Sequence, residues 1–264
     1  MESLSARTFK LTIEYDGTEF AGWQVQPGKE TIQGSLQRAV QALVGEHANV
    51  IGSGRTDAGV HALGQVASCQ FAWQDSTERL TMALNAHLPD AIVVTKVEEA
   101  VAGFHAIRDA LGKRYRYQLQ LGGRRDPFQS RYRWHIHHQL NAEAMAQAAS
   151  HFLGRHDFRG FQTTGSERKT TIREIRACEV FSQSNMLSDR IHLAIEIEAD
   201  GFLYNMVRTM VGTLVEVGRG KRPPDWIDEL LAKRERAQAG QTAPPQGLWL
   251  VRVDYPPTCL QNDG

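Results

Sequence analysis

The sequence has few cysteines and no excess of charge. Among its 264 residues there are three cysteines, Cys69, Cys178 and Cys259, and none forms a Cys-x-x-Cys pair. An odd number of isolated cysteines argues against a disulfide framework and is typical of a protein from a reducing cytoplasm. The 30 basic residues equal the 30 acidic ones in number, so the charge of the whole chain does not predict binding to nucleic acid.

Long apolar runs are absent too. The longest candidate, residues 202–218, is interrupted by Asn205, Arg208 and Glu216, and no run is long enough to span a bilayer. The first ten residues, MESLSARTFK, lack the apolar region of a secretory signal. Apolar residues make up 41% of the chain and charged residues 23%, which is ordinary for a globular protein. We therefore expect a cytoplasmic protein that does not associate with membranes.

Signatures of several enzyme classes are missing. The chain has no Gly-x-Ser-x-Gly motif, and none of its cysteines has an activating context, so serine or cysteine hydrolase chemistry is not expected. The glycines at 52, 54 and 59 precede a strand-like segment, whereas a dinucleotide fingerprint opens a helix. The five histidines between residues 135 and 156 lack the spacing of zinc ligands. No metal site is expected.

Strand-like and helical segments alternate in a similar order in the two halves of the chain. The first half has alternating strand patterns at 8–15, 64–71 and 91–97, and helical patterns at 31–45 and 76–88. The second half has strand patterns at 113–121, 172–181, 191–199 and 248–253, and helical patterns at 141–154, at 202–217 and from Pro224. We expect an α+β fold of two similar halves flanked by helices, divided into residues 1–105 and 106–264.

Residues 52–65, GSGRTDAGVHALGQ, place three glycines around Arg55 and Asp57. The glycines would permit positive φ and the close approach of a bulky ligand. Arg55, two positions earlier, would keep the Asp57 carboxylate ionised. Such a carboxylate can pair with a cation or attack an electrophile. A structural Asx-turn, with Arg55 in a surface ion pair, explains these residues equally well.

Two further side chains invite attention. Tyr115 alternates with Tyr117 along 113–121, which is most often a core position. Arg208 lies in an otherwise apolar helical stripe and shares a face with Asn205 and Gly212. An arginine that is partly buried needs a carboxylate partner, but the pattern does not name it.

Charge is uneven between Arg108 and Arg133, where eight basic residues stand against two acidic ones. A local basic stripe of this kind can hold phosphates. It can also be the solvated face of a strand and its loop, and the pattern alone does not decide between the two.

The octapeptide RTDAGVHA at 55–62 resembles the signature of the tRNA pseudouridine synthase A family. Similar blocks follow one another in the family's order over nearly the whole chain: YDGTEFAGWQVQ (15–26), TIQGSLQRAV (31–40), NAHLP (85–89), GKRYRY (112–117), DPFQSRYRWHI (126–136), FRGFQTTGSERKTTIREI (158–175), GFLYNMVRTMVGTLVEVGRG (201–220) and GLWLVRVDY (247–255).

This resemblance implies a pseudouridine synthase fold, with a mostly antiparallel mixed sheet and an active-site cleft between the halves. It implies isomerisation of uridine to pseudouridine at positions 38, 39 and 40 in the anticodon stem-loop of tRNA. The family works as a homodimer without metal or organic cofactor. By motif position, Asp57 matches the catalytic aspartate, Tyr115 the tyrosine on the target base, and Arg208 the basic residue that pairs with the aspartate.

Substrate contacts are expected from further residues. Leu248 matches the apolar residue that packs on the base, and Arg55, Arg168 and Lys169 are expected to contact RNA, the last two from the polar loop TTGSERK. One departure is visible: the family commonly has arginine after Phe-His-Ala, whereas this chain has Ile107 there. The resemblance leaves three routes open for Asp57: attack at C6 of the base, attack at C1′ of the ribose, or departure of the base through a glycal. The rival interpretation is a tRNA-binding module without catalysis.

Overall fold

The computed structural model describes residues 5–163, 170–183 and 190–261. The chain forms two compact units, which we describe separately. Unit 1 comprises residues 1–111 together with 250–264, and unit 2 comprises residues 112–249. The chain therefore passes from one unit to the other twice.

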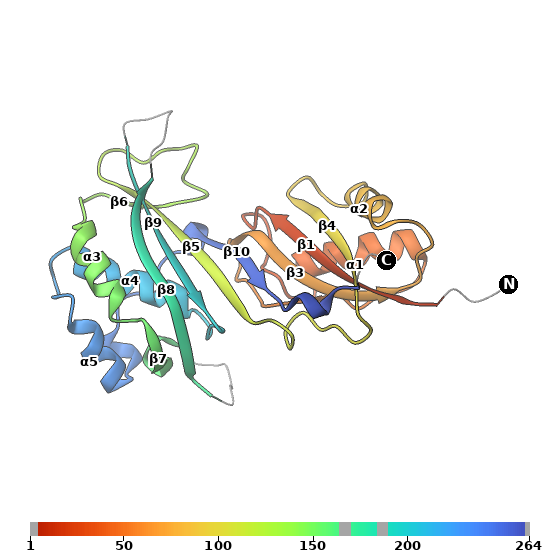
Figure 1. The fold of residues 1–264 in the computed structure, drawn as a ribbon. Coiled ribbons are helices and arrows are strands. Elements are labelled where there is room, and N and C mark those ends of the chain that lie inside the picture. The colour runs from red at the N-terminus through yellow and green to blue at the C-terminus, as the bar shows by residue number, and fades with distance from the viewer. Residues whose placement is uncertain (1–4, 164–169, 184–189, 262–264) are drawn as a thin grey trace. The chain divides into compact units, whose positions relative to one another are not determined.

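Unit 1 contains strands in the order β4-β1-β3-β10 (Figure 1). Strand β1 (Arg7–Tyr15) pairs antiparallel with both β3 (His61–Phe71) and β4 (Ile92–Ala100), and the short β2 (Ile51–Gly52) pairs with β3. Strand β10 spans Leu248–Asp254, and its residues from Leu250 onward belong to unit 1. Helices α1 (Ile32–Val44) and α2 (Thr77–Asn85) contact each other, and α2 packs on β4.

Unit 2 contains strands in the order β5-β9-β8-β7, with each neighbouring pair antiparallel. Their bounds are β5 (Gly112–Leu121), β9 (Ile191–Ala199), β8 (Ile172–Gln183) and β7 (Gly154–Asp157), and the short β6 (Trp134–Ile136) pairs parallel with the end of β5. The helices are α3 (Ala142–Ser150), α4 (Met206–Gly218) and α5 (Trp226–Lys233). Helix α3 packs on both β8 and α4. Mostly antiparallel strands flanked by helices confirm the expected α+β class.

The helix starts that depend on local capping agree with the sequence prediction. Thr31 precedes α1, and its Oγ1 accepts a hydrogen bond from Gly34 N–H at 3.2 Å. Ser76 and Asn141 cap α2 and α3 in the same way. Gly45 ends α1 with a φ of 74°, a conformation that glycine adopts at little cost.

Three helix boundaries differ from the prediction. Helix α4 begins at Met206 rather than at residue 202, because Asn205 has a left-handed φ of 59°. Helix α5 begins at Trp226, two residues after Pro224. Helix α3 ends at Ser150, and Gly154, expected at its end, instead opens β7 with a φ of 92°.

The compact units also differ from the expected division after residue 105. The C-terminal segment returns to unit 1, where Tyr255 packs edge-on against Phe104 at 5.2 Å and donates its hydroxyl hydrogen to Ala106 O at 2.6 Å. Phe104 and Ala106 form a buried apolar cluster with Cys259. This burial keeps residues 106–111 and 250–261 together in unit 1, although 250–261 follow the whole of unit 2 in the chain.

Candidate functional site

Asp57 lies in the loop between β2 and β3 of unit 1. The loop closes a turn in which Val60 N–H donates to Asp57 O at 3.1 Å, and Gly59 within that turn has a φ of 76°. Thr56 is buried, whereas the Asp57 side chain is partly exposed. The Asp57 carboxylate is therefore partly exposed, on a loop whose backbone is held by this turn and by the buried Thr56.

The segment that follows β1 holds this loop by direct backbone contact. Gly17 and Gly22 both lie against it. A Cβ at Gly22 would stand 2.6 Å from Thr56 O and 3.1 Å from the Asp57 carbonyl carbon, and a Cβ at Gly17 would overlap Val60 O. Any side chain at either position would push the Asp57 loop away. Gly17 and Gly22, the two glycines of YDGTEFAGW, are therefore needed for the close contact between this segment and the Asp57 loop.

Hydrogen bonds join the same two segments. Trp23 N–H donates to Thr56 O at 3.0 Å, and Gly17 N–H donates to His61 Nδ1 at 3.1 Å. The hydroxyls of Tyr15 and Thr56 bond at 2.8 Å. Burial raises the pKa of Tyr15 to about 12.

The other side of the loop is held by Gln65, which is buried on β3. Its amide nitrogen donates to Gly54 O at 2.9 Å, and its Oε1 accepts from the Ser53 hydroxyl at 2.7 Å. Gly52 meets the Trp23 indole, which a Cβ would overlap. Of the glycines at 52, 54 and 59, only Gly59 has positive φ. Gly52 therefore serves packing inside the protein and not, as the sequence suggested, the approach of a ligand.

Arg55 has an exposed side chain whose Nε donates to Gln24 Oε1 at 3.1 Å. Gln24 in turn donates to Gln33 Oε1 at 2.8 Å. This bond directs Arg55 toward the Gln24–Gln33 pair. The expected effect of Arg55 on Asp57 stays a prediction.

In unit 2, Tyr115 lies on β5 with 8% of its surface exposed. Its ring meets that of Phe202 edge-on, at a centroid distance of 5.1 Å and an angle of 88°. The arginines that alternate with it are neutralised by acids of β9: Arg114 Nε donates to Glu198 Oε2 at 2.9 Å and Arg116 Nε to Glu196 Oε1 at 2.6 Å. Arg114 and Arg116, two residues of the basic stripe, are thus paired within the sheet.

Arg208 is the third residue of α4, and hydrogen bonds to Ala243 and Asn205 orient its guanidinium. Nε donates to Ala243 O at 2.7 Å, and Nη1 donates to Asn205 Oδ1 at 2.8 Å. Asn205 Nδ2 donates to Thr163 Oγ1 at 3.1 Å, and the left-handed backbone of Asn205 aims its side chain at both groups. The spacing predicted that Arg208 and Asn205 lie on one face of the helix. In the structure their side chains are hydrogen-bonded to each other.

Glycines bring residues 240–247 onto α4 and β5. A Cβ at Gly212 would overlap Gln241 O, and one at Gly240 would lie 2.5 Å from Thr213 N. Gly247 lies flat on the Tyr117 ring, where a Cβ would come within 2.5 Å. These contacts fix the segment that contains Ala243 and leads into Leu248.

Sequence reasoning did not identify Tyr117 as a site residue. Its hydroxyl donates to Pro244 O at 2.7 Å, one residue after the carbonyl that holds Arg208. Burial raises the pKa of Tyr117 well above its ordinary value, against an opposing effect of the Arg208 charge. The strict alternation of β5 placed Tyr117 on the same face as Tyr115, but only the fold shows the loop that it contacts.

The structure thus brings Arg208, Asn205, Tyr117 and the segment before Leu248 together in unit 2, with Leu248 buried. It places Asp57 and Arg55 together in one loop of unit 1. Arg168 and Lys169 lie outside the described residues. Among the described ranges, no three His, Cys, Asp or Glu side chains form a cluster that could hold a metal ion.

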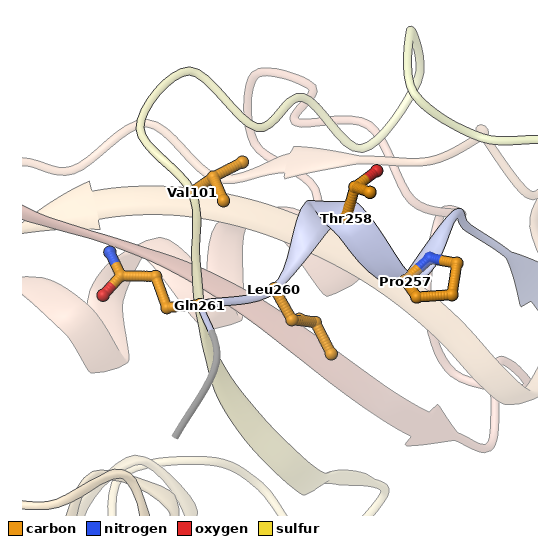
Figure 2. A pocket seen from close by; sticks show the side chains of 5 residues that line it. All are labelled: Val101, Pro257, Thr258, Leu260 and Gln261. Atoms are coloured by element: carbon orange, nitrogen blue, oxygen red, sulfur yellow. The ribbon is translucent and has the colours of Figure 1, made fainter. Parts of the chain in front are cut away.

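A cavity of about 530 Å³ in unit 1 lies elsewhere (Figure 2). It is lined by Val101, Pro257, Thr258, Leu260 and Gln261. None of these side chains is an acid or a base, so this cavity is not the candidate site. None of the helices that the structure describes is long and apolar enough to cross a bilayer.

The sequence of this chain matches a known family model and several named proteins. A family model described as tRNA pseudouridine synthase matches residues 11–107 and 148–256. The chain is 44% identical to a protein of Acetivibrio thermocellus named tRNA pseudouridine synthase A, over 94% of this chain and 100% of that one. It is 44% identical to a protein of the same name from Myxococcus xanthus, over 93% and 91% of the two chains.

A protein of that name from Geobacter sulfurreducens is 43% identical over 94% of this chain and 100% of its own. Among solved structures, a chain of a Cbf5–Nop10–Gar1 complex shares 13% identity with a TM-score of 0.34, over 91% of this chain and 57% of that one. A TM-score this low does not indicate a shared fold, and the relationship to known proteins rests on the sequence matches.

The contact between Gly22 and the Asp57 loop generates a first prediction. Gly22→Ala places a Cβ against Thr56 O at a residue with a φ of 92°, so it should lower the free energy of unfolding by about 2–4 kcal/mol. Gly28→Ala is the matched control, because Gly28 has a φ of 68° but nothing within 4 Å of the added Cβ. It should lose about 1 kcal/mol. Urea unfolding measures both, and equal losses would show that the close approach does not matter.

The hydroxyl of Tyr117 generates a second prediction. Tyr117→Phe should lower stability by about 1 kcal/mol, since the tyrosine hydroxyl donates to one backbone carbonyl. It should also reduce the rate of the catalysed reaction, because Tyr117 fixes the loop that orients Arg208. Urea unfolding and the rate are measured on the same variant, and a loss of stability at the wild-type rate would contradict this assignment.

Proposed function

Because this chain belongs to the tRNA pseudouridine synthase family, we propose that it converts uridine to pseudouridine at positions 38, 39 and 40 of the anticodon stem-loop, with Asp57 as the catalytic carboxylate. The observation that carries the proposal is the Asp57 loop. Its backbone is fixed by Gly17, Gly22 and Trp23, and its carboxylate is partly exposed. A reactive group on a preorganised loop avoids the entropic cost of being positioned at the moment of reaction.

The reaction breaks the N1–C1′ bond of uridine and forms a C5–C1′ bond in its place. The target base must first leave the helical stack. Asp57 then attacks C6 or C1′, or promotes departure of the base as a glycal forms, and the freed uracil turns and rejoins through C5. The proton on C5 passes to a general base, and N1 gains a proton, so atoms and charge balance.

Tyr115 is proposed to lie against the target base and to take part in proton transfer. The edge of Phe202 fixes the ring of Tyr115, which supports a role as a wall for an apolar base. Leu248 would supply a second apolar wall. Together they would keep solvent from the uracil while it turns.

Arg208 is proposed to form an ion pair with the Asp57 carboxylate. Hydrogen bonds to Ala243 O and Asn205 Oδ1 fix the direction of the guanidinium, which supports this proposal. A carboxylate that enters an apolar site needs such a charge, because desolvation otherwise raises its pKa.

The remaining features of the proposal concern partners. The protein would act in the cytoplasm as a homodimer, without metal or organic cofactor, and Arg55, Arg168 and Lys169 would contact the RNA. The buried, unpaired cysteines are consistent with a reducing compartment. The rival function is a tRNA-binding module that performs no chemistry, and the next experiment separates the two.

Asp57→Asn keeps the size of the side chain but removes its charge and nucleophilicity. It should lower the rate of pseudouridine formation by at least about 1,000-fold, ~4 kcal/mol in barrier, while tRNA still binds. The measurement is incubation with tRNA transcripts carrying labelled uridine, followed by nucleoside analysis and mapping of positions 38–40. Asp75→Asn is the control, since Asp75 is an exposed partner of Arg79, and it should retain full activity.

Two outcomes would contradict this proposal. Activity of Asp57→Asn within about tenfold of the wild-type protein would remove Asp57 from the chemistry. Binding of tRNA by the wild-type protein without any conversion of uridine would favour the noncatalytic module.

The pairing of Arg208 with Asp57 predicts that the two positions are coupled. Arg208→Met should lower the free energy of unfolding in the wild-type background by at least about 1 kcal/mol more than in the Asp57→Asn background. Arg208→Lys keeps the charge but loses the planar guanidinium. Its loss of unfolding free energy should therefore be smaller than that of Arg208→Met but larger than zero. Additive losses in the double-variant cycle would count against the pair.

A further inference from the structure

The loop of residues 122–133, between β5 and β6, exposes an aromatic ring. Phe128 has 84% of its surface exposed, more than any other large apolar side chain in the part of the chain that the structure describes. Burying a phenylalanine gains about 1.5–3 kcal/mol, and in this loop that gain is left unused. A single exposed apolar side chain is common on protein surfaces, so the residues around Phe128 decide which partner it fits.

The charge of this loop points to the chemistry of that partner. Arg124, Arg125 and Arg131 are exposed. The only acid of the loop, Asp126, is 5% exposed and accepts a hydrogen bond from Arg190 at 2.9 Å. The exposed charges of the loop are therefore all positive.

The loop is also fastened in place. Gln120, buried on β5, donates to Arg124 O at 2.9 Å and accepts from Asp126 N–H at 3.0 Å. Asp126 Oδ1 accepts from Phe128 N–H at 2.9 Å. Arg133 closes the loop by donating to Gln183 Oε1 at 3.0 Å. The ring and the two arginines on its N-terminal side are displayed on a fixed backbone, which lowers the entropic cost of binding.

From these observations we propose that the 122–133 loop binds an unpaired nucleotide of the substrate RNA, distinct from the uridine that is converted. Phe128 stacks on the base, and Arg124 and Arg125 contact the flanking phosphates. This inference rests on the proposed function, since it takes tRNA as the substrate. Base stacking on an aromatic ring contributes about 1–3 kcal/mol and tolerates any base, and arginines supply the salt-dependent attraction to the backbone.

A second copy of this chain fits the surface less well. Two copies of the loop placed against each other would bring like charges together around the two phenylalanines, which disfavours contact between the loops. RNA supplies the opposite charge and a flat apolar face at once. Charge complementarity therefore favours RNA over contact between two copies of the loop.

Phe128→Ala tests the stacking. It should raise KM for tRNA by about five- to tenfold, in line with the loss of one stacked base, and leave kcat unchanged. Phe128→Trp keeps an aromatic face and should retain the wild-type KM, whereas Phe128→Leu should behave like Phe128→Ala. Met82→Ala is the control, because Met82 is 66% exposed on α2 and should change nothing.

The phosphate contacts have their own signature. The variant with both Arg124→Ala and Arg125→Ala should reduce the slope of log KM against log salt concentration by about 1–2, whereas Phe128→Ala should leave the slope unchanged. Because these side chains are exposed, all variants should unfold at the wild-type urea concentration.

The possible outcomes separate this inference from the proposed function. A wild-type protein that forms no pseudouridine would refute the proposed function first. If the wild-type protein is active but Phe128→Ala keeps its KM, the loop does not stack on RNA and the inference fails. If Phe128→Ala instead lowers the oligomeric mass by light scattering at unchanged KM, the surface binds a second copy, which also overturns it.

Discussion

The close approach of two backbone segments in unit 1 determines where Asp57 can lie. Gly17 and Gly22 allow the chain after β1 to touch the carbonyls of Val60 and Thr56, and no residue with a Cβ could replace either without moving the loop. The hydrogen bond from Trp23 and the packing of its indole on Gly52 fix the same loop from a second direction. The position of one carboxylate thus depends on residues 34 to 40 places earlier in the sequence.

In unit 2, close contacts at glycines fix the surroundings of Arg208 in a similar way. Gly212, Gly240 and Gly247 let the loop of residues 240–247 lie directly on α4 and on the Tyr117 ring. The loop returns a carbonyl to Arg208, and Asn205 supplies a side-chain oxygen. A charged group on each unit is therefore oriented by glycine contacts that are established when the chain folds, before any substrate binds.

Local signals in the sequence predicted the elements whose ends depend on neighbouring residues. The caps at Thr31, Ser76 and Asn141 and the alternation of β5 are examples, because a helix start or a strand face is decided within a few positions. Interactions between distant residues were not predictable in this way. The pairing of Arg114 with Glu198, the bond from Arg55 to Gln24 and the clamp of Tyr117 on Pro244 join residues between 31 and 127 positions apart. The motif RTDAGVHA identified Asp57 as a candidate, but it could not show why the surrounding glycines are needed.

The central claim is that the Asp57 loop is ordered before RNA binds, and hydrogen exchange tests it directly. The amides of Trp23, Ser53 and Val60 donate to Thr56 O, Val66 O and Asp57 O, so in the free protein they should exchange only through large-scale unfolding. Addition of tRNA should slow them little beyond that limit. Rapid exchange of these three amides in the free protein, with protection appearing only when tRNA is added, would show that the substrate orders the loop and would contradict this account.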